Sequence, residues 1–255
     1  MELFYREYGE GKPLIVLHGL FGFSDNWVTL ARQFASRGYH MYLVDQRNHG
    51  NSPHAEEWNY EVMAEDLRDF VEKHELERPV VLGHSMGGKT AMEFAVRYPN
   101  MLEKLIVADI APKAYPVHHQ QIIEGLSAVR LEELTKRSEA DRELQKYVQE
   151  TGVRQFLLKN LARDAQGNFR WKMNLPVIRR HIEEVVRPVC EGAHFMKPAL
   201  FLRGGKSDYI TEVDYPLIED IFTDVKFVCF EQAGHWLHAE EPARVLEEVL
   251  AFLEE

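Results

Sequence analysis

The sequence has little that would tie the chain to a membrane, to nucleic acid or to an oxidising compartment. No apolar run approaches the roughly 18 residues of a membrane-spanning helix, and the N-terminus lacks the basic start and apolar core of a signal peptide. A formal net charge of −11 argues against a phosphate backbone as partner. The two cysteines, Cys190 and Cys229, lie far apart and have no metal-ligand spacing. These absences predict a cytoplasmic protein with free thiols and no metal, nucleic-acid or membrane partner.

The chain does contain a regular alternation of short apolar runs and helical patterns. The apolar runs are typical of strands buried on both faces of a parallel sheet. They lie at residues 13–17, 41–45, 79–82, 105–108, 198–202 and 226–230. Amphipathic helical patterns, such as those over 60–74 and 243–253, separate them. The alternation predicts an α/β fold with a mostly parallel central sheet and helices on both faces.

The strand signals stop between residues 111 and 189, where charged helical patterns follow one another. The sequence therefore divides into a core of residues 1–110 and 190–255 and a helical cap of residues 111–189 inserted in that core. Ligands of open α/β sheets bind at the carboxyl ends of the strands. We therefore expect the cap to cover that edge as a lid.

The motif Gly83-His84-Ser85-Met86-Gly87 reads G-x-S-x-G and lies between a predicted strand and a predicted helix. A serine at the tip of a sharp strand-to-helix turn is strained, and small neighbours are needed on either side of it. The N-terminus of the helix then offers free N–H groups and a partial positive charge to a developing oxyanion. This context predicts that Ser85 is a nucleophile.

A nucleophilic serine needs an imidazole base, and that imidazole needs an acid to fix its tautomer. His235 follows the last predicted strand in Gly234-His235-Trp236, where a strand-ordered triad would place the base. The sequence offers two acids. Asp109 ends the strand after the serine, and Asp208 follows the strand after the cap. Both strand ends open at the edge that carries Ser85, so the choice between the two carboxylates stays open here.

An oxyanion hole needs two N–H donors. The backbone N–H of Met86 is one candidate, and the loop after the second strand, His18-Gly19-Leu20-Phe21-Gly22, supplies the other. Within that loop Leu20 is favoured, with Phe21 next. Phe21 and Trp236 are expected to wall an apolar acyl pocket, together with apolar residues of the cap.

Five motifs together resemble the α/β-hydrolase superfamily, and in particular the bacterial YbfF-type esterases and their mitochondrial abhydrolase relatives. The motifs are His18-Gly19-Leu20-Phe21-Gly22, Asp45-Gln46-Arg47-Asn48-His49-Gly50-x-Ser52, Gly83-His84-Ser85-Met86-Gly87-Gly88-Lys89, Asp109-Ile110-Ala111-Pro112 and Gly234-His235-Trp236-x-His238. The resemblance covers nearly the whole chain and implies an α/β-hydrolase fold with a helical cap and no cofactor. Members of this family keep the acid that matches Asp109, and many lack one at the position of Asp208. The wider superfamily favours the position of Asp208, so the acid stays open.

The resemblance implies a serine hydrolase that cleaves short-chain acyl esters or thioesters through an acyl-enzyme. Two alternatives are a cofactor-free haloperoxidase or perhydrolase, which uses the same triad, and a non-catalytic binding protein on a hydrolase fold. Because Ser85 and His235 are both present, the binding protein is the weaker alternative. A haloalkane dehalogenase is excluded, since it needs an aspartate in place of Ser85. We expect a monomer or a small homo-oligomer.

Overall fold

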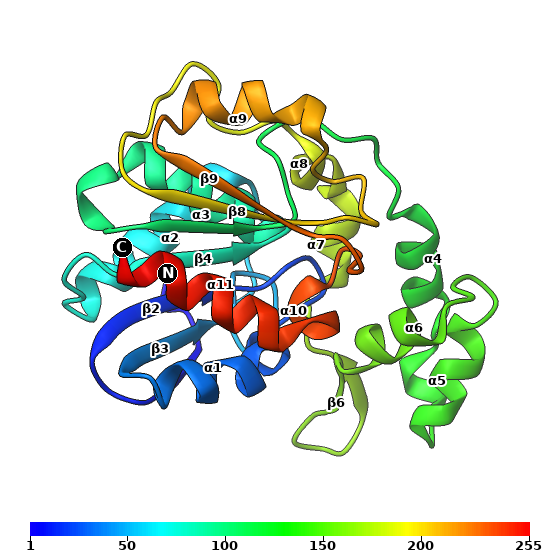
Figure 1. Ribbon diagram of the computed structural model, residues 1–255. Coiled ribbons are helices and arrows are strands. Elements are labelled where there is room, and N and C mark those ends of the chain that lie inside the picture. Colours follow the sequence, from blue (N-terminus) through cyan, green and yellow to red (C-terminus); the bar gives the residue numbers. More distant parts are fainter.

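The central sheet has seven strands in the order β1-β3-β2-β4-β5-β8-β9, in a computed structural model that describes residues 1–255 (Figure 1). The strands are β1 (Tyr5–Tyr8), β2 (Lys12–Leu17), β3 (Tyr39–Val44), β4 (Val80–His84), β5 (Leu105–Ala108), β8 (Ala199–Gly204) and β9 (Val225–Phe230). Every pair is parallel except β1 with β3. This confirms the mostly parallel sheet that the apolar runs predict.

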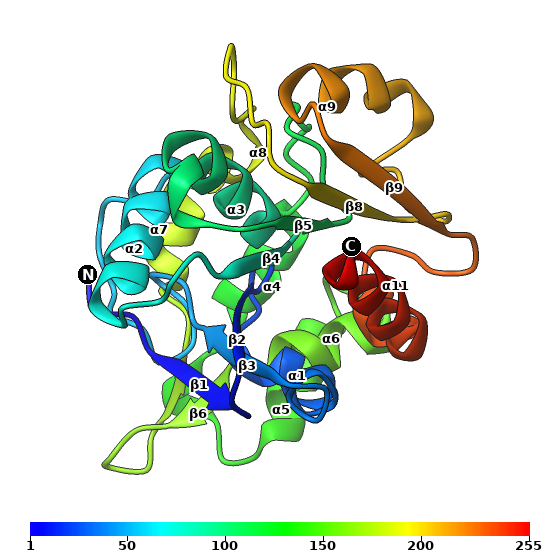
Figure 2. The same ribbon diagram turned by 60° about the vertical axis from the view of Figure 1, so that its left-hand side comes forward.

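Helices cover both faces of the sheet, because successive strand residues point to opposite sides. The cluster on one face includes Leu14 and Val16 of β2 and packs against α1 (Val28–Ala35) and α11 (Pro242–Glu254). The cluster on the other face includes Ile15 and Leu17 and packs against α2 (Tyr60–Lys73), α3 (Met86–Arg97) and α9 (Tyr215–Ile221). Figure 2 shows α2 and α3 on one side of the strands and α1 and α11 on the other. The fold is therefore the three-layer α/β arrangement expected from the sequence.

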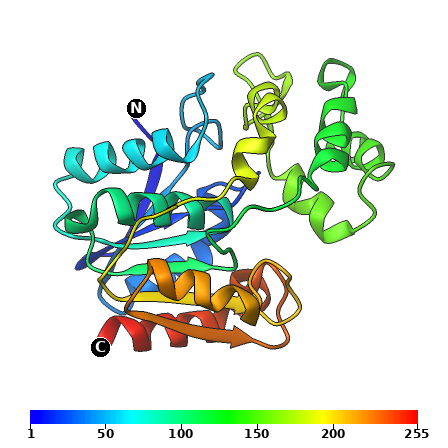
Figure 3. The ribbon, with the colours of Figure 1, turned by 90° about the horizontal axis from the view of Figure 1, so that it is seen from above.

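The segment between β5 and β8 forms the cap, which lies beyond the carboxyl edge of the sheet (Figures 1 and 3). Its helices are α4 (Gln120–Ala128), α5 (Arg137–Leu144), α6 (Thr151–Leu158), α7 (Leu175–Arg180) and α8 (Ile182–Val186). The chain also has a short helix α10 (Leu237–Glu240). Its four 3₁₀ turns are η1 (Ser24–Trp27), η2 (Pro99–Met101), η3 (Leu131–Glu133) and η4 (Glu212–Asp214).

One part of the cap departs from the helical expectation. Strands β6 (Leu161–Arg163) and β7 (Phe169–Trp171) pair as an antiparallel hairpin. The turn between them is held by Asp164, whose Oδ1 accepts hydrogen bonds from the N–H groups of Gln166 and Asn168. Gly167 takes a φ of 89° in this turn, which favours glycine. Strands of three residues are too short for an alternating pattern to reveal them.

The strand register brings the carboxyl ends of four strands together at one edge of the sheet. Gly83 of β4 pairs with Leu17 of β2, and His84 pairs with Ala108 of β5. Ala108 in turn pairs with Leu202 of β8. The residues that follow β2, β4, β5 and β8 therefore lie side by side, as expected for parallel strands.

No helix of the structure combines the length and the apolar character that a membrane crossing requires. The cytoplasmic location, the domain boundaries and the monomeric or small homo-oligomeric state stay predictions.

Candidate active site

Ser85 lies in a strained turn between β4 and α3. Its φ of 52° and ψ of −119° are unfavourable for a residue with a side chain. The turn is possible because two glycines allow the backbone to pass closely. A Cβ on Gly83 would lie 2.1 Å from the carbonyl oxygen of Gly87, and a Cβ on Gly87 would lie 2.4 Å from that of Leu17. The backbone thus has the geometry of a nucleophile elbow.

Asp109 and His235 are joined by a hydrogen bond although 126 positions separate them. The Nδ1 of His235 lies 2.8 Å from Oδ2 of Asp109. The Asp109 side chain follows β5 directly and is fully buried. Its Oδ1 accepts a 2.8 Å hydrogen bond from the N–H of Gly204, and its Oδ2 also accepts one from the hydroxyl of Ser207. A buried carboxylate with three donors is well satisfied as an anion.

Asp208 is not brought to His235. Its side chain is exposed and makes no hydrogen bond or ion pair within the protein. The reason is the turn after β8, in which the N–H of Ser207 bonds to the carbonyl of Gly204. This turn directs the Ser207 hydroxyl at Asp109 and leaves the next side chain in solvent. Of the two carboxylates that the sequence offers, the geometry therefore favours Asp109.

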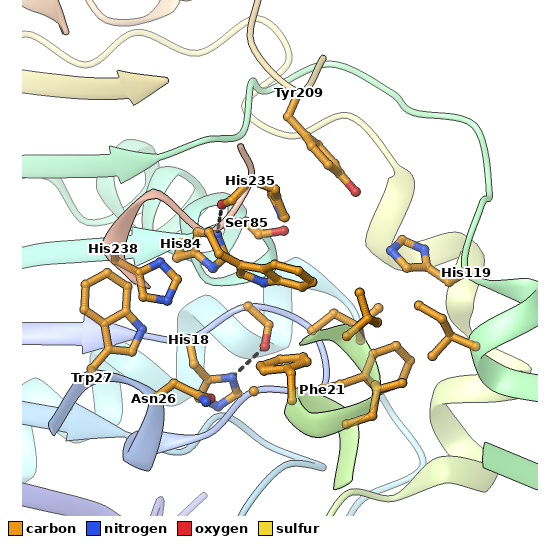
Figure 4. Close-up of a pocket in the computed structure, with 18 of the residues that line it drawn as sticks. His18, Phe21, Asn26, Trp27, His84, Ser85, His119, Tyr209, His235 and His238 are labelled. Carbon is orange, nitrogen blue, oxygen red and sulfur yellow. Dashed lines mark hydrogen bonds between the residues drawn. The ribbon is translucent and has the colours of Figure 1, made fainter. Parts of the chain in front are cut away.

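The ring of His235 is held between two other rings. Tyr209 stacks on it with centroids 4.0 Å apart and an interplanar angle of 21°, and His84 lies 4.7 Å away. The Nε2–H of His84 donates a 2.8 Å hydrogen bond to the carbonyl of His235. Burial holds the pKa of His84 well below its usual value, so this imidazole is neutral and acts as a fixed donor. These contacts leave the Nε2 of His235 without a hydrogen bond, on the cavity that Ser85 also lines (Figure 4).

The loop after β2 lies against the serine. A Cβ on Gly19 would come within 3.2 Å of the Ser85 Cβ. The N–H groups of the next two residues, Leu20 and Phe21, make no hydrogen bond within the protein. Met86 is the first residue of α3, where the backbone N–H has no partner in its own helix. The candidate oxyanion donors therefore lie on the two segments that flank the serine.

A cavity of about 320 Å³ connects these groups to the cap. Its apolar wall combines Phe21 and Trp236 of the core with Ile122, Val153 and Phe156 of the cap. The rings of Phe156 and Trp236 meet at 5.6 Å. Figure 4 shows Ser85 and His235 on one side of this cavity and His119 on the cap side. Several histidines line the cavity, but no three His, Cys, Asp or Glu side chains are placed to hold a metal ion.

Known proteins share both the sequence and the shape. Residues 12–131 match the family described as alpha/beta hydrolase fold. The sn-1-specific diacylglycerol lipase ABHD11 of Danio rerio is 36% identical over 253 residues, which are 96% of this chain and 80% of that protein. Esterase YbfF of Escherichia coli is 34% identical over 244 residues, covering 94% of this chain and 92% of YbfF. The chain belongs to the α/β-hydrolase family.

Solved structures agree with this assignment. A marine microorganism esterase superposes on the hydrolase with a TM-score of 0.95 at 45% identity, covering 98% of this chain and 99% of the other. E-2-(acetamidomethylene)succinate hydrolase superposes with a TM-score of 0.80 at 17% identity, covering 99% and 95% of the two chains, which supports the fold alone. The chain is thus an enzyme of a family whose named members here include esterases and a lipase. The resemblance inferred from the motifs is confirmed.

Buried polar side chains fix the loops beneath the site of this hydrolase. The Nδ1–H of His18 donates to the Gly19 carbonyl at 2.8 Å, and its Nε2 accepts from the Gln46 N–H at 3.0 Å. Burial lowers the pKa of His18 to about 4, which keeps the ring neutral and suited to this double role. Arg47 makes a bidentate pair with Asp66, with distances of 2.6 and 2.8 Å. His18 also lines the cavity, whereas Arg47 and Asp66 lie outside its lining, and all three position the loops.

Sequence reasoning missed two residues of the hydrolase site. Ser207 bonds to the carboxylate of Asp109, and Tyr209 stacks on His235. Both lie in the loop after β8, on either side of Asp208, whose carboxylate is the candidate acid that the sequence offers in that loop. A serine and a tyrosine in a loop carry no sequence signal of their own.

Proposed function

We propose that this hydrolase cleaves short-chain acyl esters or thioesters through a Ser85-His235-Asp109 triad and an acyl-enzyme intermediate. The observation that carries the proposal is the 2.8 Å hydrogen bond from His235 to the buried carboxylate of Asp109. It lies beside a strained serine that lines the same cavity as the imidazole. The esterases among the relatives support the same reaction class.

In the proposed mechanism Asp109 accepts the Nδ1–H of His235, which leaves a lone pair on Nε2. That nitrogen takes the proton of the Ser85 hydroxyl while the serine oxygen attacks the carbonyl carbon of the substrate. The oxygen of the tetrahedral intermediate accepts hydrogen bonds from the N–H groups of Leu20 and Met86. His235 then gives its proton to the leaving alcohol or thiol. A water molecule repeats these steps on the acyl-enzyme, releases the acid and restores the serine, without a cofactor.

The cavity supports a small substrate. A volume of about 320 Å³ is near the lower end of the range for small-molecule sites. Each methylene that fits the apolar wall gains about 0.8 kcal/mol, and a methylene beyond the end of the cavity gains nothing or clashes with the cap. The kcat/KM for a series of acyl chains should therefore peak near butyryl and fall by octanoyl.

Three measurements test the proposal. A fluorophosphonate probe should label the wild type and leave Ser85→Ala unlabelled, because the probe reacts with the activated hydroxyl. Ser85→Ala should also lose roughly 10⁴-fold or more in kcat on p-nitrophenyl butyrate. A series of p-nitrophenyl esters from acetyl to decanoyl, run beside the matching acyl-CoA series, separates ester from thioester preference. Wild-type turnover by Ser85→Ala would exclude a serine hydrolase.

A further inference from the structure

Lys89 is a fully buried lysine with no carboxylate partner. It lies one helical turn after Ser85 in α3, and its backbone N–H bonds to the carbonyl of Ser85 at 3.1 Å. The Nζ donates to two backbone carbonyls, that of Lys113 at 2.9 Å and that of Arg187. A buried ammonium is costly unless acceptors surround it, so these two carbonyls account for its presence.

The two carbonyls belong to the two segments that join the cap to the core. We call these segments the stalks: residues 111–117, between β5 and α4, and residues 185–190, which end α8 and lead towards β8 (Figure 3). The stalks also bond to each other. The N–H of Tyr115 donates to the carbonyl of Val186, and the N–H of Val189 donates to the carbonyl of Pro112, both at 2.9 Å. One side chain of the nucleophile helix thus contacts both connections of the cap.

Two tyrosine rings complete the surroundings of the ammonium. Its Nζ lies 4.8 Å from the ring centroid of Tyr115 and 5.7 Å from that of Tyr60. The hydroxyl of Tyr60 donates a 2.7 Å hydrogen bond to the carbonyl of Val185 in the second stalk. Burial lowers the pKa of Lys89 to about 7, whereas the ring faces and carbonyls stabilise the charged form. The whole arrangement fixes the stalks against α2 and α3.

Tyr115 continues the contacts to the proposed base. Its hydroxyl accepts a 2.8 Å hydrogen bond from the N–H of Ala111 and donates a 2.6 Å hydrogen bond to the carbonyl of Tyr209. The ring of Tyr209 is the one that stacks on His235. A displaced stalk would therefore move this ring as well as the cap residues that wall the cavity.

We propose that Lys89 is a positioning residue that holds both stalks of the cap against the nucleophile helix, and thereby sets the cavity wall and the Tyr209 ring against His235. Its effect on turnover rests on the proposed ester hydrolysis, whereas its hold on the stalks does not. Lys89 touches neither the substrate nor the reacting atoms, and acts through Tyr115, Tyr209 and the cap.

The chain offers a matched control in Lys104. This lysine is also buried, donates to the carbonyls of Phe252 and Leu253 at 2.7 and 3.4 Å, and lies 4.9 Å from the ring centroid of Phe252. It precedes β5 and therefore lies at the amino edge of the sheet, away from the cap. Lys89→Met and Lys104→Met remove the same kind of buried ammonium, and both should lower Tm.

The test compares the two variants by hydrogen exchange and by kinetics on p-nitrophenyl butyrate. Lys89→Met should speed amide exchange in the stalks by about tenfold or more, raise KM and lower kcat/KM about tenfold or more. Lys104→Met should leave stalk exchange and kcat/KM near the wild type. Equal losses of kcat/KM in both variants, or unchanged stalk exchange in Lys89→Met, would overturn the proposal.

Tyr115→Phe provides a second test of the proposal, which can be used if Lys89→Met does not fold. It keeps the ring beneath the ammonium and removes the hydroxyl that bonds to Tyr209. It should lower kcat by about threefold to tenfold. Amide exchange should stay near that of the wild type in the second stalk and rise at Ala111, whose N–H loses its acceptor. An unchanged kcat would overturn the link to His235. If the wild type hydrolyses no ester and takes no fluorophosphonate, the proposed function fails. The exchange comparison still decides the role of Lys89 in that case.

Discussion

Replacing Asp109 by asparagine tests the triad most directly, because the hydrogen bonds around the carboxylate leave an amide no good orientation. If the amide oxygen faces the N–H of Gly204, its NH₂ group faces the Nδ1 of His235. The imidazole must then accept at Nδ1 and carry its proton on Nε2, where it cannot take the proton of the serine. If the amide is turned over, its NH₂ group meets the N–H of Gly204, and two donors oppose each other in a buried site.

Either orientation removes the productive tautomer or costs a buried hydrogen bond. Loss of the orienting acid in a serine triad lowers kcat by about 10⁴-fold, which corresponds to about 5 kcal/mol of transition-state stabilisation. We therefore expect Asp109→Asn to lose about that much in kcat on p-nitrophenyl butyrate, with a much smaller change in KM. Circular dichroism and Tm would check that the variant is folded.

Asp208→Asn is the matched control. The Asp208 side chain is exposed and bonds to nothing in the protein, so its kcat should stay within about twofold of the wild type. A loss of about 10³-fold or more in Asp208→Asn, with Asp109→Asn near wild type, would refute the reasoning from the hydrogen bonds and assign the acid to Asp208.

Three further predictions follow from other contacts. Ser207→Ala removes one donor to the carboxylate of Asp109 and should lower kcat about tenfold with little change in KM; an unchanged kcat would show that the hydroxyl has no role. Phe156→Ala shortens a side chain of the cap wall and so enlarges the cavity; it should move the kcat/KM optimum to longer acyl chains, which an unaltered chain-length profile would contradict. Burial lowers the pKa of His49 to about 3, so the unfolded chain binds a proton that the folded chain does not as pH falls below 6.5. Below that pH, His49 thus lowers the free energy of unfolding by about 1.4 kcal/mol per pH unit. In urea titrations at about pH 6.5 and 4.5, the free energy of unfolding of His49→Asn should fall by about 2 kcal/mol less between the two pH values than that of the wild type; equal falls would contradict the neutral ring.

The sequence could not predict which acid bonds to His235, the stacking of Tyr209 on that ring, or the contacts of the stalks. Asp109 and Asp208 both follow strands that end at the same edge, and sequence spacing cannot tell which carboxylate reaches His235. The turn after β8 decides this by pointing Ser207 inward and Asp208 outward. Lys89 is part of the serine motif, but the sequence assigns it no role, because its two acceptors lie on segments that come together only when the cap folds back on the core.

The sequence by itself determined the mostly parallel sheet, the succession of strands and helices along the chain, and the serine turn. Each of these depends on residues close together in the chain: apolar runs bury strands on both faces, and Gly83 and Gly87 admit the strained backbone of Ser85. The tertiary structure alone decided which acid meets the imidazole, where the cap hairpin forms and what holds the stalks. The bond between Asp109 and His235 joins residues 126 positions apart, and the bond from Lys89 to Arg187 joins residues 98 positions apart. A local pattern carries no information on which of several polar side chains will meet across such a distance. The hairpin is local, but its strands of three residues are too short for an alternating pattern to show them.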